Sequence, residues 1–205
     1  MRWPCRLNNL RAELDNLLPE AKRKRALVIG GGVVGKAVGE MFAANLIPFS
    51  VIDQTIISKE NREFFLKLGA ELIEKFQVDT SMRNLTNEEF VFGVSSPGIS
   101  PDNEMIRAIS DANIPIYSEI DFASAFVGMP EVAVTGTNGK TTTVNLIHQM
   151  LCADGVDSRL VGNVGNAFIE QVTPQSINVV NQERSQCFVC ELSSFQLSAC
   201  KHFAP

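Results

Sequence analysis

The segment Glu131-Val-Ala-Val-Thr-Gly-Thr-Asn-Gly-Lys-Thr-Thr-Thr143 sets the architecture of the second half of the chain. The apolar, β-prone run at 132–134 leads into a turn with two glycines, and a helix is predicted from Thr142 to about Leu151. A strand, a glycine-rich turn and a helix in this order are typical of a phosphate-binding loop. Both the backbone N–H groups of the turn and the helix N-terminus attract an anion. The alternative is a plain glycine-rich turn.

The individual residues of this loop suit nucleotide chemistry. Lys140 can reach the β- and γ-phosphates, and the Thr141 hydroxyl can hold Mg²⁺. The general loop pattern places another glycine where this chain has Val134, so the segment follows a compact form, Gly-Thr-Asn-Gly-Lys-Thr-Thr. The predicted ATP-binding residues are Gly136, Thr137, Asn138, Gly139, Lys140, Thr141 and Thr142.

The composition limits the classes of protein to which the chain can belong. Its 205 residues suffice for one large or two small domains, and 45% of them are hydrophobic. A net charge of −5 argues against a general nucleic-acid binder. No apolar run reaches the roughly 18 residues of a membrane span, so no membrane partner is expected. Five cysteines, an odd number, suit a reducing cytoplasm better than a disulfide framework.

Strand-like and helix-like segments alternate along the whole chain, which indicates α/β architecture with a mostly parallel sheet and helices on both faces. Strands are predicted at 26–29, 49–52, 71–73, 90–94, 114–117, 132–134, 159–161 and 187–190. Helices between them include 102–112, with Asp102 as N-cap, 119–127 and 166–172. The turn at Val127-Gly-Met-Pro130 predicts two domains, 1–127 and 128–205. The second has so few strands that we expect it to be cut short.

A second glycine-rich loop follows the first predicted strand. Gly30, Gly32 and Gly35 satisfy G-x-G-x-x-G before a helix, and Asp53 ends the next strand. This is the dinucleotide fingerprint, in which a diphosphate lies at the helix N-terminus and the acid binds a ribose hydroxyl. The loop by itself is equally compatible with NAD and with a UDP compound.

Three further motifs lie at predicted strand ends, where open α/β sheets bind their ligands. They are Ser95-Ser-Pro-Gly-Ile-Ser-Pro101, Gly162-Asn-Val-Gly165 and Glu191-Leu-Ser-Ser-Phe-Gln-Leu197. Glu191 next to a phosphate loop could hold Mg²⁺ or its waters, because hard cations prefer oxygen ligands. Alone, it could equally be a solvated acid at the end of a strand.

The compact loop and these motifs, in this order, resemble the Mur ligase family, which includes the folylpolyglutamate synthetases. The resemblance extends from about residue 26 to 205. Ser95–Pro101, Ile114–Ala123 and Glu191–Leu197 resemble the branch that adds D-glutamate to UDP-N-acetylmuramoyl-L-alanine. The segment 173–186 is polar, and its part from Ser176 to Gln186 is longer than the family usually has, so we expect a surface insertion there. Gln54-Thr55 stands where the family often carries Thr-Arg.

The resemblance implies a Rossmann-like, parallel-sheet N-terminal domain followed by a truncated P-loop ATPase-type α/β domain. It implies that ATP and Mg²⁺ convert the L-alanine carboxylate to an acyl phosphate, which the amine of D-glutamate attacks. Lys140 and Glu191 would be catalytic, and Thr141 and Glu191 would bind the metal. The residues implied for the UDP substrate are Val33, Val34, Asp53, Gln54, Ser96, Pro97, Gly98 and Asn163. A C-terminal remainder of the ligase is expected, without which the chain would not make the amide bond.

Other interpretations stay open at this point. A nucleotide-binding module without chemistry, or an NAD-type Rossmann protein, would share the glycine loops. Cys187-x-x-Cys190 with Cys200-x-His202 supplies four zinc-type ligands, although Cys187 and Cys190 are expected on opposite faces of a strand. Ser193 and Ser194 lack the G-x-S-x-G elbow of a serine hydrolase.

Overall fold

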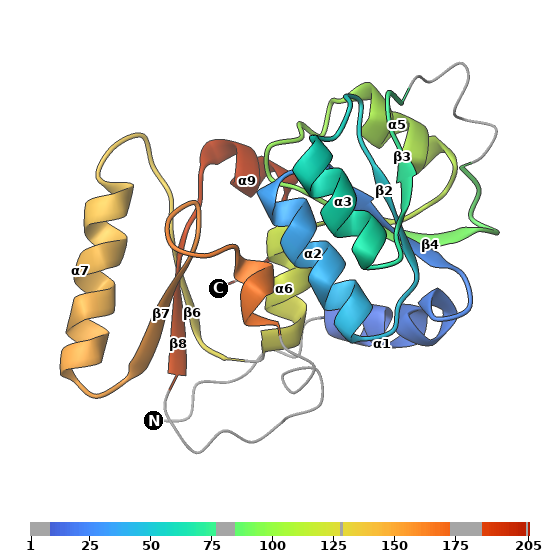
Figure 1. Ribbon diagram of the computed structural model, residues 1–205. Coiled ribbons are helices and arrows are strands. Elements are labelled where there is room, and N and C mark those ends of the chain that lie inside the picture. The colour runs from blue at the N-terminus through green and yellow to red at the C-terminus, as the bar shows by residue number, and fades with distance from the viewer. Residues whose placement is uncertain (1–8, 77–84, 128, 173–185, 204) are drawn as a thin grey trace.

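The computed structural model describes residues 9–76, 85–127, 129–172, 186–203 and 205. Most of the polar segment 173–186 therefore lies outside the described residues. The chain forms two parallel β-sheets, each with its own helices, and the helix α6 (Glu119–Val127) lies between them (Figure 1). The prediction of an α/β fold with parallel sheets is confirmed.

The first sheet has five strands in the order β3-β2-β1-β4-β5, all parallel. The strands are β1 (Arg25–Ile29), β2 (Phe49–Ile52), β3 (Glu71–Ile73), β4 (Phe90–Ser95) and β5 (Ile116–Ser118). This order is the one found in Rossmann-type sheets, in which the chain runs outward from β1 on one side and from β4 on the other. The N-terminal sheet is Rossmann-like, as expected.

Helices cover both faces of this sheet. The apolar side chains of α1 (Asn9–Ala21), α2 (Val33–Ala44), α3 (Lys59–Lys67) and α6 pack in one core cluster with one face. Those of α5 (Glu104–Asp111) pack on the other face with Leu27, Ile29 and Ile52. The buried strands are therefore continuous apolar runs, which is usual where a parallel sheet is covered on both sides.

The second sheet has three parallel strands in the order β6-β8-β7. They are β6 (Glu131–Val134), β7 (Asp157–Gly162) and β8 (Gln186–Glu191), with helix α7 (Lys140–Ala153), the 3-10 helix η2 (Phe168–Gln171) and helix α9 (Ser194–Ala199). Because β8 is the central strand, Cys187 and Cys190 are both buried, although their side chains alternate along it.

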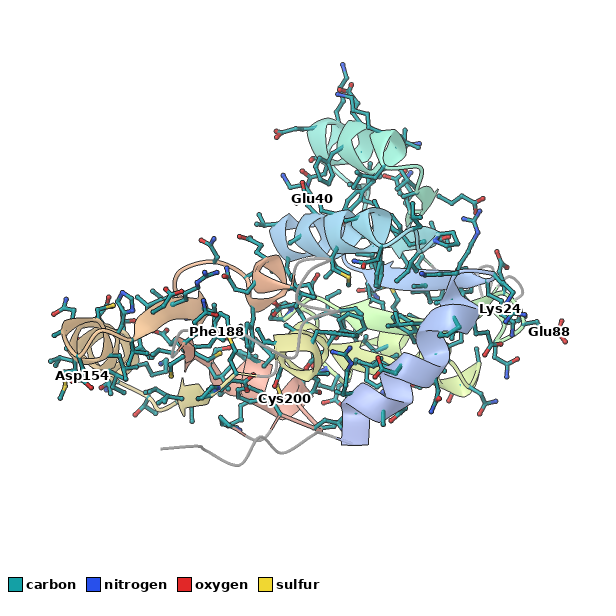
Figure 2. The ribbon with its side chains drawn as sticks, turned by 90° about the horizontal axis from the view of Figure 1, so that it is seen from below. Lys24, Glu40, Glu88, Asp154, Phe188 and Cys200 are labelled. Carbon is teal, nitrogen blue, oxygen red and sulfur yellow. The ribbon has the colours of Figure 1, made fainter. Side chains whose placement is uncertain are left out.

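One hydrophobic core continues from the first sheet to the second. It runs from Leu14 of α1 through Phe122 of α6 to Phe168 and Phe188, whose ring centroids are 5.2 Å apart. Figure 2 shows Phe188 and Cys200 in the middle of the molecule, between Asp154 at one end and Lys24 at the other. Because this core is shared, the boundary between two domains at 127/128 remains a proposal. The division of the strands into two sheets supports it.

The structure corrects several details of the sequence analysis. Asn103, not Asp102, caps α5, since its Oδ1 accepts the N–H of Met105 at 2.8 Å. The helix predicted at 166–172 is only the 3-10 turn η2, because Asn166 bridges to Val161 of β7 and cannot be helical. Within the residues that the structure describes, no helix is long and apolar enough to cross a membrane.

Candidate functional site

The strands β1 and β4 lie side by side, but the connections that follow them turn to opposite sides of the sheet. Such a switch point opens a crevice at the carboxyl ends of the two strands. A cleft of about 580 Å³ lies here, between the two halves of the chain. Its lining residues are Gly32, Val34, Ser96, Pro97, Gly98, Ser100, Glu119, Gly162, Asn163, Ala167, Ser193, Phe195 and Gln196.

The first glycine loop forms one edge of this cleft because its backbone is tightly packed. A Cβ at Gly35 would lie 2.0 Å from the carbonyl oxygen of Gly30, so only glycine lets α2 start this close to β1. Gly30 itself has φ of 101°, a left-handed conformation that favours glycine. The N-terminus of α2 is thereby held at the cleft.

Five of the eight residues predicted for the UDP substrate line the cleft: Val34, Ser96, Pro97, Gly98 and Asn163. The Oγ of Ser96 is buried and has no hydrogen-bond partner among the described residues. An unpaired buried hydroxyl costs free energy, so a polar ligand group would satisfy it. Four of these five residues come from α2 or from the loop after β4 of the first sheet, and Asn163 follows β7 of the second sheet.

The other three predicted residues are not among those lining the cleft. Val33 is 72% exposed. The Asp53 carboxylate accepts the backbone N–H groups of Gly31 and Thr55, each at 2.8 Å, and thereby fixes the glycine loop. Gln54 accepts a hydrogen bond from the Asn103 side chain at 2.8 Å, which ties the end of β2 to the cap of α5. Their contacts to a ligand stay predictions.

The residues of the predicted phosphate loop are brought together at the carboxyl end of β6. Gly136 and Gly139 have φ of 148° and 79°, and Gly139 caps α7, so the helix begins at Lys140. The loop 135–139 is exposed. The Lys140 Nζ donates to the carbonyl oxygen of Gly136 at 2.8 Å and so folds back over the loop.

Glu191 connects this loop to the cleft. The Thr141 hydroxyl donates to Glu191 Oε2 at 2.8 Å, and the Asn163 amide donates to Oε1 at 2.8 Å. Glu191 is only 2% exposed, and it is held in place because β8 lies between β6 and β7. One carboxylate thus joins the first hydroxyl of α7 to the cleft wall.

Comparison with known proteins shows which family the chain resembles. Residues 134–204 match the family model of the Mur ligase middle domain. The chain is 36% identical over 191 residues to the UDP-N-acetylmuramoylalanine--D-glutamate ligase of Geotalea daltonii, and 30% identical over 182 residues to that of Christiangramia forsetii. These alignments cover 91% and 89% of this chain. The chain belongs to the Mur ligase family.

The chain aligns with only part of each of these Mur ligases. The chain spans 39% and 38% of the length of the two curated relatives. A solved structure of a pseudomurein peptide ligase type C from Methanothermus fervidus matches 82% of this chain and 33% of its own, at 18% identity and a TM-score of 0.39. A TM-score this low does not establish a shared fold, so membership of the Mur ligase family rests on the sequence matches.

The donor atoms beside the predicted phosphate loop are oxygens, from the Thr141 hydroxyl and the Glu191 carboxylate. Oxygen donors suit Mg²⁺, which is usually held by one or two carboxylates together with waters and substrate phosphates. The described part of the chain holds no group of three or more His, Cys, Asp or Glu side chains that could hold a metal. Among the four zinc-type residues of the sequence, Cys200 accepts a hydrogen bond from Ser118 at 3.6 Å.

Sequence reasoning missed one charged residue of the cleft, Glu119. It is 1% exposed, and burial raises its pKa from 4.5 to about 7, while hydrogen bonds from the backbone of Ile169 and Phe168 oppose the rise. Its place directly after β5 was the available signal, because strand ends line the site in such folds. Phe195 and Gln196 were part of a motif but were not assigned to the cleft.

Proposed function

We propose that this chain supplies the nucleotide-binding parts of an ATP-dependent ligase that joins D-glutamate to UDP-N-acetylmuramoyl-L-alanine, a step in the synthesis of peptidoglycan precursors. In the proposed reaction, the alanine carboxylate takes the γ-phosphoryl group of ATP and ADP leaves. The amine of D-glutamate then attacks the acyl carbon, and phosphate leaves as the amide forms. The two curated relatives carry this specificity in their names.

The observation that carries the proposal is the bridge through Glu191. Phosphoryl transfer to a carboxylate requires the ATP site and the substrate site to meet within a few ångströms. Glu191 accepts hydrogen bonds from Thr141 of the phosphate loop and from Asn163 of the cleft, so the two sites share one carboxylate. A module that bound only a dinucleotide would have no need of this connection.

The phosphate loop would bind the ATP phosphates through the backbone N–H groups from Asn138 to Thr142. The Lys140 ammonium would leave its exposed hydrogen bond with the Gly136 carbonyl oxygen and contact the γ-phosphoryl group instead. Catalysis of this kind depends on position and on neutralising charge.

Thr141 and Glu191 would hold Mg²⁺, and both offer the oxygen atoms that this ion requires. When bound, the ion would supply positive charge to the phosphate oxygens. Thr141 and Glu191 are already 2.8 Å apart, so neither side chain needs a large movement to share a ligand.

The cleft would hold the UDP-N-acetylmuramoyl part. Its diphosphate would lie at the start of α2, and the buried Ser96 hydroxyl would gain a partner. The Asn163 side chain, which contacts Glu191, would turn toward the substrate.

D-Glutamate has no assigned residues among those described. Because the relatives are longer than this chain, we propose the whole reaction for a protein of their length. Free thiols at Cys152, Cys187, Cys190 and Cys200 support a reducing cytoplasm as its location.

Binding of ATP with Mg²⁺ tests the phosphate-loop half of the proposal. We expect Lys140→Ala to weaken ATP binding at least tenfold, since it removes the only side-chain charge placed by the motif. Circular dichroism should not change, because the side chain makes a single exposed hydrogen bond. Lys67→Ala, at an exposed position of α3, is the matched control and should bind ATP as the unaltered chain does. Equal ATP affinity in all three proteins would reject the assignment.

A further inference from the structure

The first turn of α6 buries two carboxylates, Glu119 and Asp121, each 1% exposed. Buried charge is costly unless hydrogen bonds satisfy it. Neither residue takes part in the proposed phosphate or metal binding. Both accept hydrogen bonds from backbone segments that follow strands of the second sheet, although α6 itself continues from the first sheet.

Glu119 anchors the segment that follows β7. Its Oε1 accepts the N–H of Ile169 at 2.6 Å, at the start of η2, and Ile169 is fully buried. The chain reaches η2 directly from the loop 162–167, which places Gly162, Asn163 and Ala167 on the cleft wall. A contact that fixes η2 therefore also limits the movement of this wall.

Asp121 anchors the segment that follows β8 and α9. Its Oδ2 accepts the N–H of Lys201 at 2.9 Å, and its Oδ1 accepts those of His202 and Phe203 at 3.0 and 2.7 Å. These three residues come just after α9, which carries Phe195 and Gln196 on the cleft. Three hydrogen bonds to one buried carboxylate make this end of α9 a fixed point.

We infer that Glu119 and Asp121 are positioning residues. They hold two walls of the cleft, the loop 162–167 and helix α9, against the third wall formed by Ser96–Gly98. Both acids lie within one helical turn, so one rigid element sets the place of both walls. The shape of the cleft, and with it the affinity for a nucleotide-sugar ligand, depends on these backbone contacts. The identity of that ligand rests on the proposed function, whereas the anchoring does not.

Amide hydrogen exchange tests the anchoring without any ligand. At pH 8, above the pKa of about 7 to which burial raises Glu119, its carboxylate is charged. Hydrogen bonds to charged groups are strong, so Glu119→Ala should speed exchange of Ile169 by about tenfold or more. Glu119→Gln keeps a carbonyl oxygen as acceptor and should restore protection. Asp121→Asn also keeps one acceptor oxygen but presents an amide in place of the other. It should speed exchange of Lys201 and leave His202 and Phe203 protected.

Titration with UDP-N-acetylmuramoyl-L-alanine then tests the consequence for the cleft. Glu119→Ala should weaken binding about tenfold, and Glu119→Gln should return the affinity to near that of the unaltered chain. Binding of ATP should change little in either. Glu170→Gln is the matched control, because it removes an exposed acid from η2 without a backbone contact, and it should leave both measurements unchanged.

The outcomes separate the two proposals. If the unaltered chain does not bind the UDP compound, the proposed function fails. The amide exchange rates still test whether Glu119 and Asp121 anchor their backbone partners. Unchanged exchange at Ile169 in Glu119→Ala, or faster exchange with unchanged affinity, would overturn the positioning role. Should Glu119→Ala not fold, Asp121→Asn decides, and unchanged exchange at Lys201 would count against the inference.

Discussion

Burial of Glu119 predicts that the stability of the chain falls as the pH rises from about 4.5 to about 7. Burial raises the pKa of Glu119 from 4.5 to about 7, against the opposing hydrogen bonds from Ile169 and Phe168. Between these values the folded chain keeps a proton that the unfolded chain has lost. The free energy of unfolding therefore decreases through this window and levels off above it. One pKa unit corresponds to about 1.4 kcal/mol. At pH 8, Glu119 therefore lowers the free energy of unfolding by about 3 kcal/mol relative to its value at pH 4.5 and below.

Glu119→Gln removes this titration and keeps an oxygen that can accept the Ile169 N–H. The variant should be more stable than the unaltered chain by up to about 3 kcal/mol at pH 8, and nearly equal to it at pH 4.5. Among the described residues, Glu170, Cys190 and Cys200 interact electrostatically with Glu119, and none of these three is a cation that would compensate its charge.

Urea unfolding at pH 5, 6, 7 and 8 measures the difference, with Glu40→Gln, which changes an exposed acid of α2, as the control. Burial also raises the pKa of Glu131 to about 7, while the hydrogen bond from Ser124 opposes it, so Glu131→Gln should show the same trend. A stability difference that does not vary with pH, or a Glu119→Gln protein that is the less stable one at pH 8, would refute the reasoning.

Two other substitutions test the geometry of the site. Gly35→Ala should lower the free energy of unfolding by about 1–3 kcal/mol, because the new Cβ would meet the Gly30 carbonyl oxygen, whereas Gly98→Ala has open space and should be nearly neutral. Equal melting temperatures of the two variants in thermal unfolding would contradict the close approach of α2 to β1. Asn163→Asp places a second carboxylate beside Glu191, so it should cost more stability at pH 8 than at pH 5, where a shared proton relieves the repulsion; a cost independent of pH would argue against that contact.

Local patterns were sufficient to predict the parallel α/β fold. The β-branched runs before Gly30 and Gly136 become β1 and β6, and the glycines between strand and helix adopt the left-handed or closely packed conformations that their motifs require. These features depend on residues close together in the sequence. Local signals were therefore enough to find them.

Features that depend on distant residues were not predictable in the same way. The predicted helix at 166–172 shrinks to η2 because Asn166 pairs with Val161. Asp53 fits the ribose-binding pattern, yet its carboxylate holds the Gly31 and Thr55 backbone. The role of Glu119 in the cleft depends on its contact with Ile169, 50 residues further along the chain. Nothing in the local sequence indicates such partners.

Calorimetric titration of the chain with UDP-N-acetylmuramoyl-L-alanine and, separately, with NAD tests the central claim most directly. The account predicts saturable binding of the UDP compound in the cleft, weakened by Ser96→Ala because the ligand would lose the buried Ser96 hydroxyl as a hydrogen-bond partner. It predicts no comparable response to NAD. Tight binding of NAD with no heat from the UDP compound would contradict the account and favour a dinucleotide-binding protein.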